Sequence, residues 1–246
     1  MIILAIDSTA RACSAAIGRD TSVLISMQND TGNTHSEQLL PMIENCLSRA
    51  SLSFEDIDAY ACTVGPGSFT GVRIGVSVIK GLAFGKNKPC IEVSSLEAIA
   101  ENLSPLHGLL CPVMDARRSQ VYTALFKVNE QGELVRLKED SAIAISDLAE
   151  ICRPLVSKDY PLYLAGDGYN LAFRELTALG IPCAITPPLL RLQNAASVLT
   201  VAARKLHAQE TKTDLTLSPL YLRLPQAERE RLEKEKALQN SNEKTK

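Results

Sequence analysis

Residues 2–7 read Ile-Ile-Leu-Ala-Ile-Asp, and residues 110–115 read Leu-Cys-Pro-Val-Met-Asp. Each stretch is a short apolar run that ends in an aspartate, which is typical of a buried strand followed by a turn. Asp115 therefore stands in the second half of the chain where Asp7 stands in the first. This echo predicts two linked copies of one structural unit.

The residues after 2–7 predict the rest of the first unit. Short polar breaks lead to two further expected strands, at 12–18 and 22–28, and breaks of this length permit an antiparallel meander. Hydrophobic periodicity then predicts alternating helices and strands. These are 34–50, 59–65, 68–84, 89–93 and 94–103. The order βββ-α-β-α-β-α is that of the ribonuclease H-like unit.

Two of these helices begin with the pattern of a capping box. Thr34 is followed three residues later by Glu37, and Ser94 by Glu97. In this motif the hydroxyl accepts a hydrogen bond from the amide of the acidic residue, whose side chain reaches back to the cap. The pattern predicts a side-chain cap at both helix starts.

The order of elements partly repeats in the second half. Strands are expected at 110–115, 119–128, 132–138, 161–165 and 181–186, and helices near 146, at 169–179 and at 194–209. We therefore expect an α/β protein with two lobes, residues 1–104 (completed by the helix at about 194–209) and 105–193. Residues 194–226 would form the return helix and a final extended segment. Residues 227–246 would form a solvated tail, because they include six Lys or Arg and five Glu.

Composition limits the classes of function. The chain has 246 residues, with 26 Lys and Arg against 28 Asp and Glu. A nucleic-acid platform usually has a basic excess, so direct tRNA binding by this chain alone is disfavoured. No apolar run reaches the roughly 20 residues of a membrane helix, and the N-terminus lacks the basic region of a signal peptide. Seven cysteines without a CxxC pair indicate reduced, buried thiols and a cytoplasmic location.

Two turns are candidates for phosphate contact. In proteins with a duplicated fold of this kind, an aspartate that ends the first strand can orient Mg²⁺ and a nucleotide phosphate through the turn that follows. The first turn, Asp7-Ser8-Thr9, lacks the glycines that allow close approach of a phosphate, so a structural aspartate is favoured there. The second turn, Asp115-Ala-Arg-Arg118, is its counterpart, with Asp115 and Arg117 as possible phosphate contacts. Its two arginines beside an aspartate could receive phosphate or carboxylate or could form surface ion pairs.

Glycines are concentrated around the helix expected at 68–84. Gly65-Pro-Gly67 precedes it, and Gly71 and Gly75 lie one turn apart within it. A glycine-rich turn before a helix can bind an anion. However, each glycine costs a helix roughly 1 kcal/mol relative to alanine, so several in one helix suggest close approach by another element. Tight packing is favoured, and the sequence leaves open whether it is within the chain or between chains. A second turn, Gly166-Asp-Gly168, is a weaker candidate for nucleotide contact.

Six stretches together resemble one family. The string from Gly65 to Gly75 is highly specific, and the others are strong as a set. The stretches are 3–7, 35–41, 65–75, 93–97, 114–118 and 219–223. Over about residues 1–224 the chain resembles the TsaB (YeaZ) family, bacterial proteins of tRNA threonylcarbamoyladenosine biosynthesis.

The resemblance implies a fold of the actin/Hsp70/sugar-kinase (ASKHA) type. It also implies a role in installing threonylcarbamoyl on N6 of adenosine 37 in tRNAs that read codons starting with A. In that system the paralogue TsaD carries the metal and the transfer chemistry, and TsaE is an ATPase partner. The TsaB-like subunit is a non-catalytic scaffold that pairs with TsaD or with itself and meets tRNA only through the complex. No catalytic residue and no cofactor of this chain are implied, since ATP and metal belong to partner subunits.

The helix at 94–103 tests part of this implication. The catalytic paralogue carries a metal-binding His-x-x-x-His pair there, and the two histidine positions correspond to Ser95 and Ile99 in this chain. An isoleucine cannot bind a metal, and a single serine hydroxyl is a poor ligand. The three histidines of the chain are scattered, so no metal site is expected.

The resemblance also implies where the subunits meet. In the family, the helices that correspond to 34–50 and 68–84 build the interface and pack like a four-helix bundle. Small residues would allow close approach, and apolar residues would be buried against the partner. The sequence does not assign which stripe faces the lobe's own sheet. The candidate interface residues are His35, Leu39, Leu40, Ile43, Gly71, Val72, Gly75 and Val78.

Two other functions stay open at this point. An ATP-dependent small-molecule kinase of the same fold would use Asp7 and Asp115 around a Mg²⁺-nucleotide, and the missing glycines after Asp7 count against it. A metallopeptidase is less favoured, because no set of metal ligands is apparent.

Overall fold

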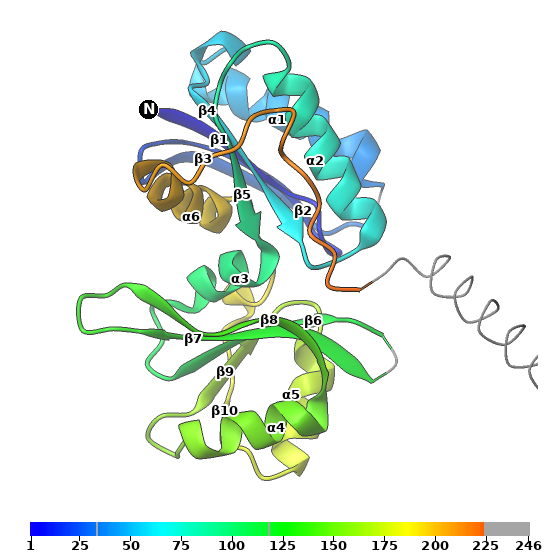
Figure 1. The fold of residues 1–246 in the computed structure, drawn as a ribbon, viewed down its shortest axis with the longest axis vertical. Coiled ribbons are helices and arrows are strands. Elements are labelled where there is room, and N and C mark those ends of the chain that lie inside the picture. The colour runs from blue at the N-terminus through cyan, green and yellow to red at the C-terminus, as the bar shows by residue number, and fades with distance from the viewer. Residues whose placement is uncertain (33, 118, 224–246) are drawn as a thin grey trace, which may run out of the picture.

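The computed structural model of the protein describes residues 1–32, 34–117 and 119–223 (Figure 1). It contains two five-stranded sheets, with strand orders β3-β2-β1-β4-β5 and β10-β9-β6-β7-β8. Read from the β8 edge, the second order is β8-β7-β6-β9-β10, which matches the first order strand by strand. The predicted α/β class with two ribonuclease H-like lobes is confirmed.

The two sheets are also alike in strand direction. In the first, β2 is antiparallel to β1 and β3, and β4 and β5 run parallel to β1. In the second, β7 is antiparallel to β6 and β8, and β9 and β10 run parallel to β6. The strands are β1 (Ile2–Asp7), β2 (Cys13–Arg19), β3 (Ser22–Asn29), β4 (Ala59–Gly65), β5 (Cys90–Ser94), β6 (Leu109–Asp115), β7 (Gln120–Val128), β8 (Leu134–Ala144), β9 (Leu162–Ala165) and β10 (Cys183–Ala184).

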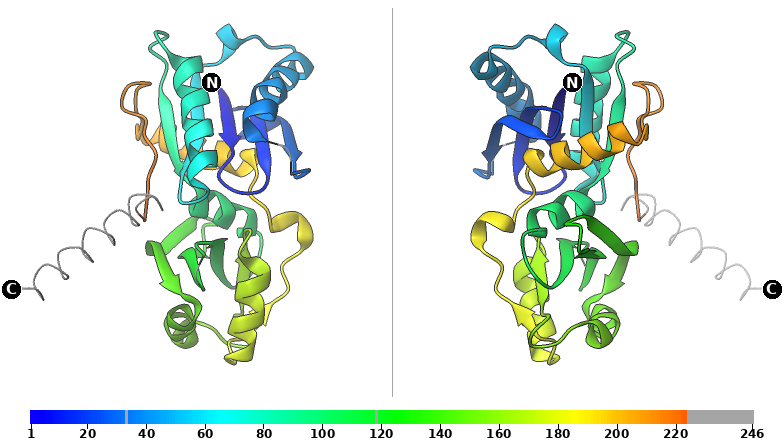
Figure 2. Two further views of the ribbon diagram at one scale, coloured as in Figure 1. Left: turned by 90° about the vertical axis from the view of Figure 1, so that its right-hand side faces the viewer. Right: turned by 90° about the vertical axis from the view of Figure 1, so that its left-hand side faces the viewer.

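Helices cover the sheets and separate the lobes. They are α1 (His35–Ala50), α2 (Phe69–Ala83), α3 (Ser95–Leu103), α4 (Ile145–Cys152), α5 (Tyr169–Ala178) and α6 (Ala195–His207), with short 3-10 turns η1 (Phe54–Asp56), η2 (Arg153–Leu155) and η3 (Pro188–Leu190). The first sheet has α1 and α2 on one face and α6 on the other (Figure 2). Helix α3 lies between the lobes, because Ala98 packs with the α6 cluster whereas Leu96 and Ile99 pack with residues of the second sheet. No helix of the described ranges is long and apolar enough to cross a bilayer.

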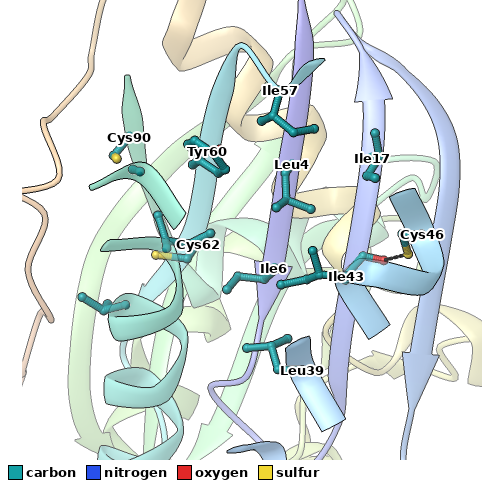
Figure 3. Close-up of a cluster of buried hydrophobic side chains, with 14 of the residues drawn as sticks. Leu4, Ile6, Ile17, Leu39, Ile43, Cys46, Ile57, Tyr60, Cys62 and Cys90 are labelled. Atoms are coloured by element: carbon teal, nitrogen blue, oxygen red, sulfur yellow. Dashed lines mark hydrogen bonds between the residues drawn. The ribbon is translucent and has the colours of Figure 1, made fainter. Parts of the chain in front are cut away.

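The central strand β1 shows why the first lobe folds this way. All six of its residues are buried, as expected for a strand covered on both faces. Leu4 and Ile6 face α1 and α2, while Ile3 and Ala5 face α6. Figure 3 shows the side chains of α1 pointing down onto the β1 side chains of this core.

Of the two predicted helix caps, one forms and the other does not. The Ser94 hydroxyl accepts from the amides of Leu96 and Glu97, at 3.2 and 3.3 Å, so that cap is confirmed. The predicted cap at Thr34 is wrong. The helix starts there, but the Thr34 side chain makes no capping bond, and the Glu37 amide donates to the Thr34 carbonyl instead.

The strand ends of the second lobe differ from the prediction. β8 continues to Ala144, beyond the expected 132–138, because charged residues in its middle obscure the apolar pattern. It still pairs with β7 at both ends, with register shifts in between. β10 is only Cys183–Ala184, shorter than the expected 181–186, because prolines precede and follow it. The expected tail at 227–246 lies outside the described residues.

After α6 the chain returns along the first lobe as a segment that we call the strap, residues 209–223 (Figure 1). Lys212 exchanges two backbone hydrogen bonds with Cys90 at the edge of the first sheet, at 2.7 and 2.9 Å. Further along, Leu217 is buried in the core beneath α2, and the Leu220 amide donates to the Val64 carbonyl at 2.7 Å. The strap therefore covers the β5 edge and ends beside the turn that leads into α2.

Candidate functional site

The turn after β1 is closed by its own hydrogen bonds. Asp7, Ser8 and Thr9 are all buried. One carboxylate oxygen of Asp7, Oδ1, accepts from the Thr9 amide at 2.8 Å and from the Thr9 hydroxyl at 2.9 Å. The Ser8 hydroxyl donates to the carbonyl of Gly71 at 2.8 Å. This aspartate therefore caps a buried β-turn, as the favoured structural interpretation predicted.

The turn after β1 packs so closely against α2 and the preceding loop that three positions there have no room for a Cβ atom. A Cβ on Gly71 would stand 2.0 Å from the Ser8 carbonyl oxygen, and one on Gly67 would stand 2.3 Å from that of Thr9. A Cβ on Gly75 would lie 2.6 Å from the Ser8 hydroxyl. The predicted tight packing is confirmed, and it is contact within one chain.

This packing decides what the first turn can bind. The Thr9 amide and hydroxyl donate to Asp7, and the Ser68 amide, at the start of α2, donates to the Thr9 carbonyl at 2.7 Å. Both donors of Thr9 and the hydroxyl of Ser8 are therefore used, and α2 packs directly against the turn. Burial raises the pKa of Asp7, although its bonds from Thr9 act in the opposite direction. The predicted phosphate contacts of Asp7, Ser8 and Thr9 do not fit this arrangement.

The corresponding turn after β6 is open. Asp115 and Arg117 are exposed. The Asp115 carboxylate accepts from the Arg117 amide at 2.7 Å, and the Asp115 amide donates to Asp167 at 3.1 Å. This turn keeps the Arg117 side chain at the surface, where a guanidinium could receive an anion, and contact of Asp115 and Arg117 with phosphate remains a prediction. Arg118 lies outside the described residues.

The two positions where the resemblance implies metal ligands in a paralogue carry serine and isoleucine in this chain. Ser95 and Ile99 are both fully buried, and Ile99 is part of the core between α3 and the second sheet. No group of three His, Cys, Asp or Glu side chains in the described ranges could hold a metal ion. All seven cysteines are unpaired, and Cys183 is the one that is not fully buried.

The predicted interface residues divide into two sets. Five of them do not reach the surface of the chain and so do not fit the predicted contact with a partner. They are buried inside their own lobe: Leu39, Ile43, Gly71, Val72 and Gly75. Figure 3 shows Leu39 and Ile43 directed at the β1 side chains. The sequence did not show that the apolar stripe of each helix is used to cover the sheet.

The other three candidates keep accessible surface. Leu40 is 42% exposed on α1, and Val78 is half-buried on α2. His35 is half-buried at the start of α1, and its Nε2 lies 2.7 Å from the carbonyl of Ala10. Their place in a subunit interface remains a prediction.

A surface cluster that the sequence analysis missed joins α2 to the strap. The rings of Phe69 and Tyr221 stack with centroids 4.6 Å apart, and the Arg73 guanidinium lies 3.9 Å above the Phe69 ring. The two contributing stretches were each noted as motifs. No local pattern connects residues so far apart in the chain, so only the fold could bring them together.

Comparisons with known proteins agree with this architecture. A family profile described as "TsaD: tRNA N6-adenosine threonylcarbamoyltransferase" matches residues 29–231. The tRNA threonylcarbamoyladenosine biosynthesis protein TsaB of Haemophilus influenzae is 31% identical over 232 residues, which cover 91% of this chain and 94% of that protein. The protein of the same name from Bacillus subtilis is 34% identical over 171 residues, which cover 70% of this chain and 73% of that protein. A solved structure described as "YeaZ from Pseudomonas aeruginosa" has a TM-score of 0.72 at 26% identity and covers 90% of this chain and 99% of its own.

The duplicated topology, shared with that structure over most of the chain, defines a two-lobed protein of the actin/Hsp70/sugar-kinase (ASKHA) type. Within this class the chain belongs to the TsaB (YeaZ) family, and so to the wider family that the TsaD profile describes.

Proposed function

We propose that this chain serves tRNA threonylcarbamoyladenosine biosynthesis as a non-catalytic scaffold subunit. It would pair with the catalytic subunit TsaD and act with the ATPase TsaE in transferring threonylcarbamoyl to N6 of adenosine 37. Membership of the TsaB family supports the process. The observation that carries the scaffold role is the closed turn after β1, where both donors of Thr9 are used and α2 packs directly against the turn.

The chemistry of the side chains supports assigning the reaction to a partner. The positions where the resemblance implies metal ligands in the paralogue hold Ser95 and Ile99, and neither a buried isoleucine nor a lone hydroxyl supplies a metal site. ATP and metal would accordingly be held by the partner subunits. The tRNA would be met through the complex, and the process would take place in the cytoplasm.

The competing function is an ATP-dependent small-molecule kinase of the same fold. It would need both Asp7 and Asp115 to face a Mg²⁺-nucleotide. Asp115 is exposed, but Asp7 is fully buried and committed to Thr9. This asymmetry argues against the kinase. Phosphoryl transfer by the isolated chain to any small acceptor would restore it.

We propose that pairing uses the exposed side of α1 and α2, both with TsaD and in a homodimer. Leu40 and Val78 offer the apolar contacts there. Charge placed at these positions would be buried unpaired in the interface and would weaken it. Glutamate at Gly75 would not test pairing, because its Cβ would collide with Ser8 inside the lobe.

The test is reconstitution of adenosine 37 modification with and without this chain, given TsaD, TsaE and a source of threonylcarbamoyl-adenylate. We expect modification to require the chain, and Leu40→Glu, at an exposed position, to weaken pairing and activity while the melting temperature is kept. The matched control is Leu155→Glu, which changes a residue of similar exposure (44%) on the second lobe. Equal modification without the chain would refute the scaffold role.

A further inference from the structure

Two motifs that the proposed function leaves unexplained meet on one surface. Arg73 belongs to the glycine-rich string of α2, and Tyr221 belongs to the strap, 148 positions away in sequence. Nε of Arg73 donates to the Tyr221 hydroxyl at 2.9 Å, and the Arg73 guanidinium covers the face of Phe69 at 3.9 Å. Tyr221 stacks on Phe69 with an interplanar angle of 26°. The arginine is therefore held by a hydrogen bond and by an aromatic ring.

The strap that supplies Tyr221 is itself held on both sides of that residue. Before it, the Leu220 amide donates to Val64 at 2.7 Å and the Ser218 amide donates to Glu92 at 3.1 Å. After it, the Arg223 guanidinium donates to the Ala116 carbonyl of the second lobe at 2.6 Å. Tyr221 is thus a fixed support for the Arg73 side chain.

Arg73 is exposed, and no carboxylate of the described ranges forms an ion pair with it. Some other arginines of the described ranges pair with carboxylates, as Arg136 does with Asp140 and Arg204 does with Glu101. Others, such as Arg191, contact a backbone carbonyl and an aromatic ring instead. No such ion pair involves Arg73 in these ranges, where its contacts are the neutral groups of Phe69 and Tyr221. A guanidinium has five N–H donors, and the bond to Tyr221 uses one of them. The remaining fork matches a carboxylate.

The surroundings favour a protein as the source of that carboxylate. Phe84, the residue directly after α2, lies eleven positions from Arg73, about three helical turns further along, and is 73% exposed. Arginine and aromatic residues together are typical of the central part of protein interfaces. Nucleic acid is disfavoured, because the chain has a net charge of −2 and no basic excess.

We propose that Arg73, held by Phe69 and Tyr221, is a preformed receptor for an aspartate or glutamate side chain of the catalytic partner subunit. The proposal rests on the proposed function, because it extends the α1 and α2 surface that faces the partner. Holding the guanidinium before binding lowers the entropy lost in forming the pair. Tyr221 is a positioning residue for Arg73.

The test measures the affinity of the full chain for purified catalytic subunit. Arg73→Lys keeps the charge but loses the fork, so we expect at least a roughly tenfold weaker complex, and no recovery relative to Arg73→Ala. Tyr221→Phe keeps the ring and loses the hydroxyl, so a loss of a few-fold is expected. The control is Arg174→Lys, at a 75% exposed side chain on the second lobe. Melting temperatures should match the wild type throughout.

A charge exchange locates the partner group. Arg73→Glu should abolish pairing, and one Asp→Lys or Glu→Lys change in the catalytic subunit should restore it. Wild-type affinity of Arg73→Lys and Arg73→Ala would overturn the proposal, while modification that still needs the chain would leave the scaffold role intact. The proposal would also be overturned if the Arg73 variants kept their affinity for the catalytic subunit but weakened the binding of tRNA to the complex. The group bound by Arg73 would then be a phosphate. Failure of the wild-type chain to pair at all would remove the scaffold role itself.

Discussion

The two lobes have the same strand order, but the aspartate at the end of the first strand is buried in one lobe and exposed in the other. In the first lobe Asp7 is buried beneath α2, whereas in the second lobe its counterpart Asp115 is exposed. A Gly-x-Gly turn follows the next parallel strand in both, as Gly65-Pro-Gly67 and as Gly166-Asp-Gly168. The difference lies in how that turn meets the aspartate turn.

In both lobes the glycine turn packs on backbone, but the second lobe adds a side chain at the aspartate turn. A Cβ on Gly166 would stand 2.1 Å from the Val113 carbonyl oxygen, and the Gly168 amide donates to that oxygen at 3.2 Å. Gly67 and Gly71 allow α2 to lie directly on the carbonyls of Ser8 and Thr9. In the second lobe the Asp167 carboxylate accepts from the Asp115 amide and leaves the Asp115 side chain at the surface. The same topology with the same aspartate therefore does not give the same chemistry, since neighbouring side chains decide whether a turn is open.

The largest expected effect tests the closure of the first turn. Gly71→Ala would place a methyl group 2.0 Å from a backbone carbonyl oxygen, which no side-chain rotation can relieve. We expect a loss of at least about 3 kcal/mol in the free energy of unfolding, measured by urea denaturation. The matched control is Gly81→Ala in the same helix, where nothing lies within 4 Å. It should stabilise the protein by about 0.5–1 kcal/mol. Similar values for the two variants would contradict the closed turn.

A second asymmetry is the strap, which among residues 1–223 pairs with the β5 edge of the first sheet. Leu217 is 1% exposed in the first-lobe core, while Leu215, two residues earlier, is 79% exposed. Leu217→Ala should therefore cost about 2–3 kcal/mol, because it leaves a cavity beneath α2. Leu215→Ala should change stability by less than about 0.5 kcal/mol. Thermal and urea unfolding of both variants would measure this, and equal small effects would mean that the strap contributes little to the lobe.

The smallest effect concerns the pH dependence of the two aspartates. Burial raises the pKa of Asp7 above its ordinary value of 3.8, so the native state holds this proton to higher pH than the unfolded state does. The stability contributed by this group is then present below pH 3.8 and is lost as pH rises from there through the folded pKa. Asparagine does not titrate and can still accept from the Thr9 amide. The free energy of unfolding of Asp7→Asn should therefore rise relative to that of the wild type as pH increases. The total rise should be about 1.4 kcal/mol for each unit by which folding raises the pKa of Asp7.

Urea unfolding at several pH values between 3 and 8 would measure the gain. Asp115→Asn, at the exposed counterpart, should change stability by less than about 0.5 kcal/mol at pH 7. Parallel pH profiles for the wild type and Asp7→Asn would show that the Asp7 proton is not coupled to folding.

The sequence predicted most of the fold because each element has a strong local signal. The apolar run before Asp7, its echo before Asp115 and the helical stripe of α1 all reappear where they were expected. The weaker predictions failed where tertiary contacts replaced local chemistry. Thr34 has the pattern of a cap and makes no cap bond, and β8 forms by pairing with β7 despite its charged middle.

The candidate site was less predictable for a related reason. Leu39, Ile43 and Val72 form the kind of stripe that suits either a partner or a sheet, and periodicity does not distinguish the two. Gly71 and Gly75 signalled close approach, but the approaching group, Ser8, is more than sixty residues away in sequence. Arg73 and Tyr221 are further apart still.

The sequence by itself determined the duplicated α/β unit and the family, because these depend on residue types and local spacing. The tertiary structure alone decided that the first turn is closed, that the apolar stripes of α1 and α2 cover their own sheet, and that Arg73 is held by Tyr221. The physical reason is that burial and long-range contact arise only when distant segments occupy the same space. Local patterns in one sequence do not specify which distant groups come into contact.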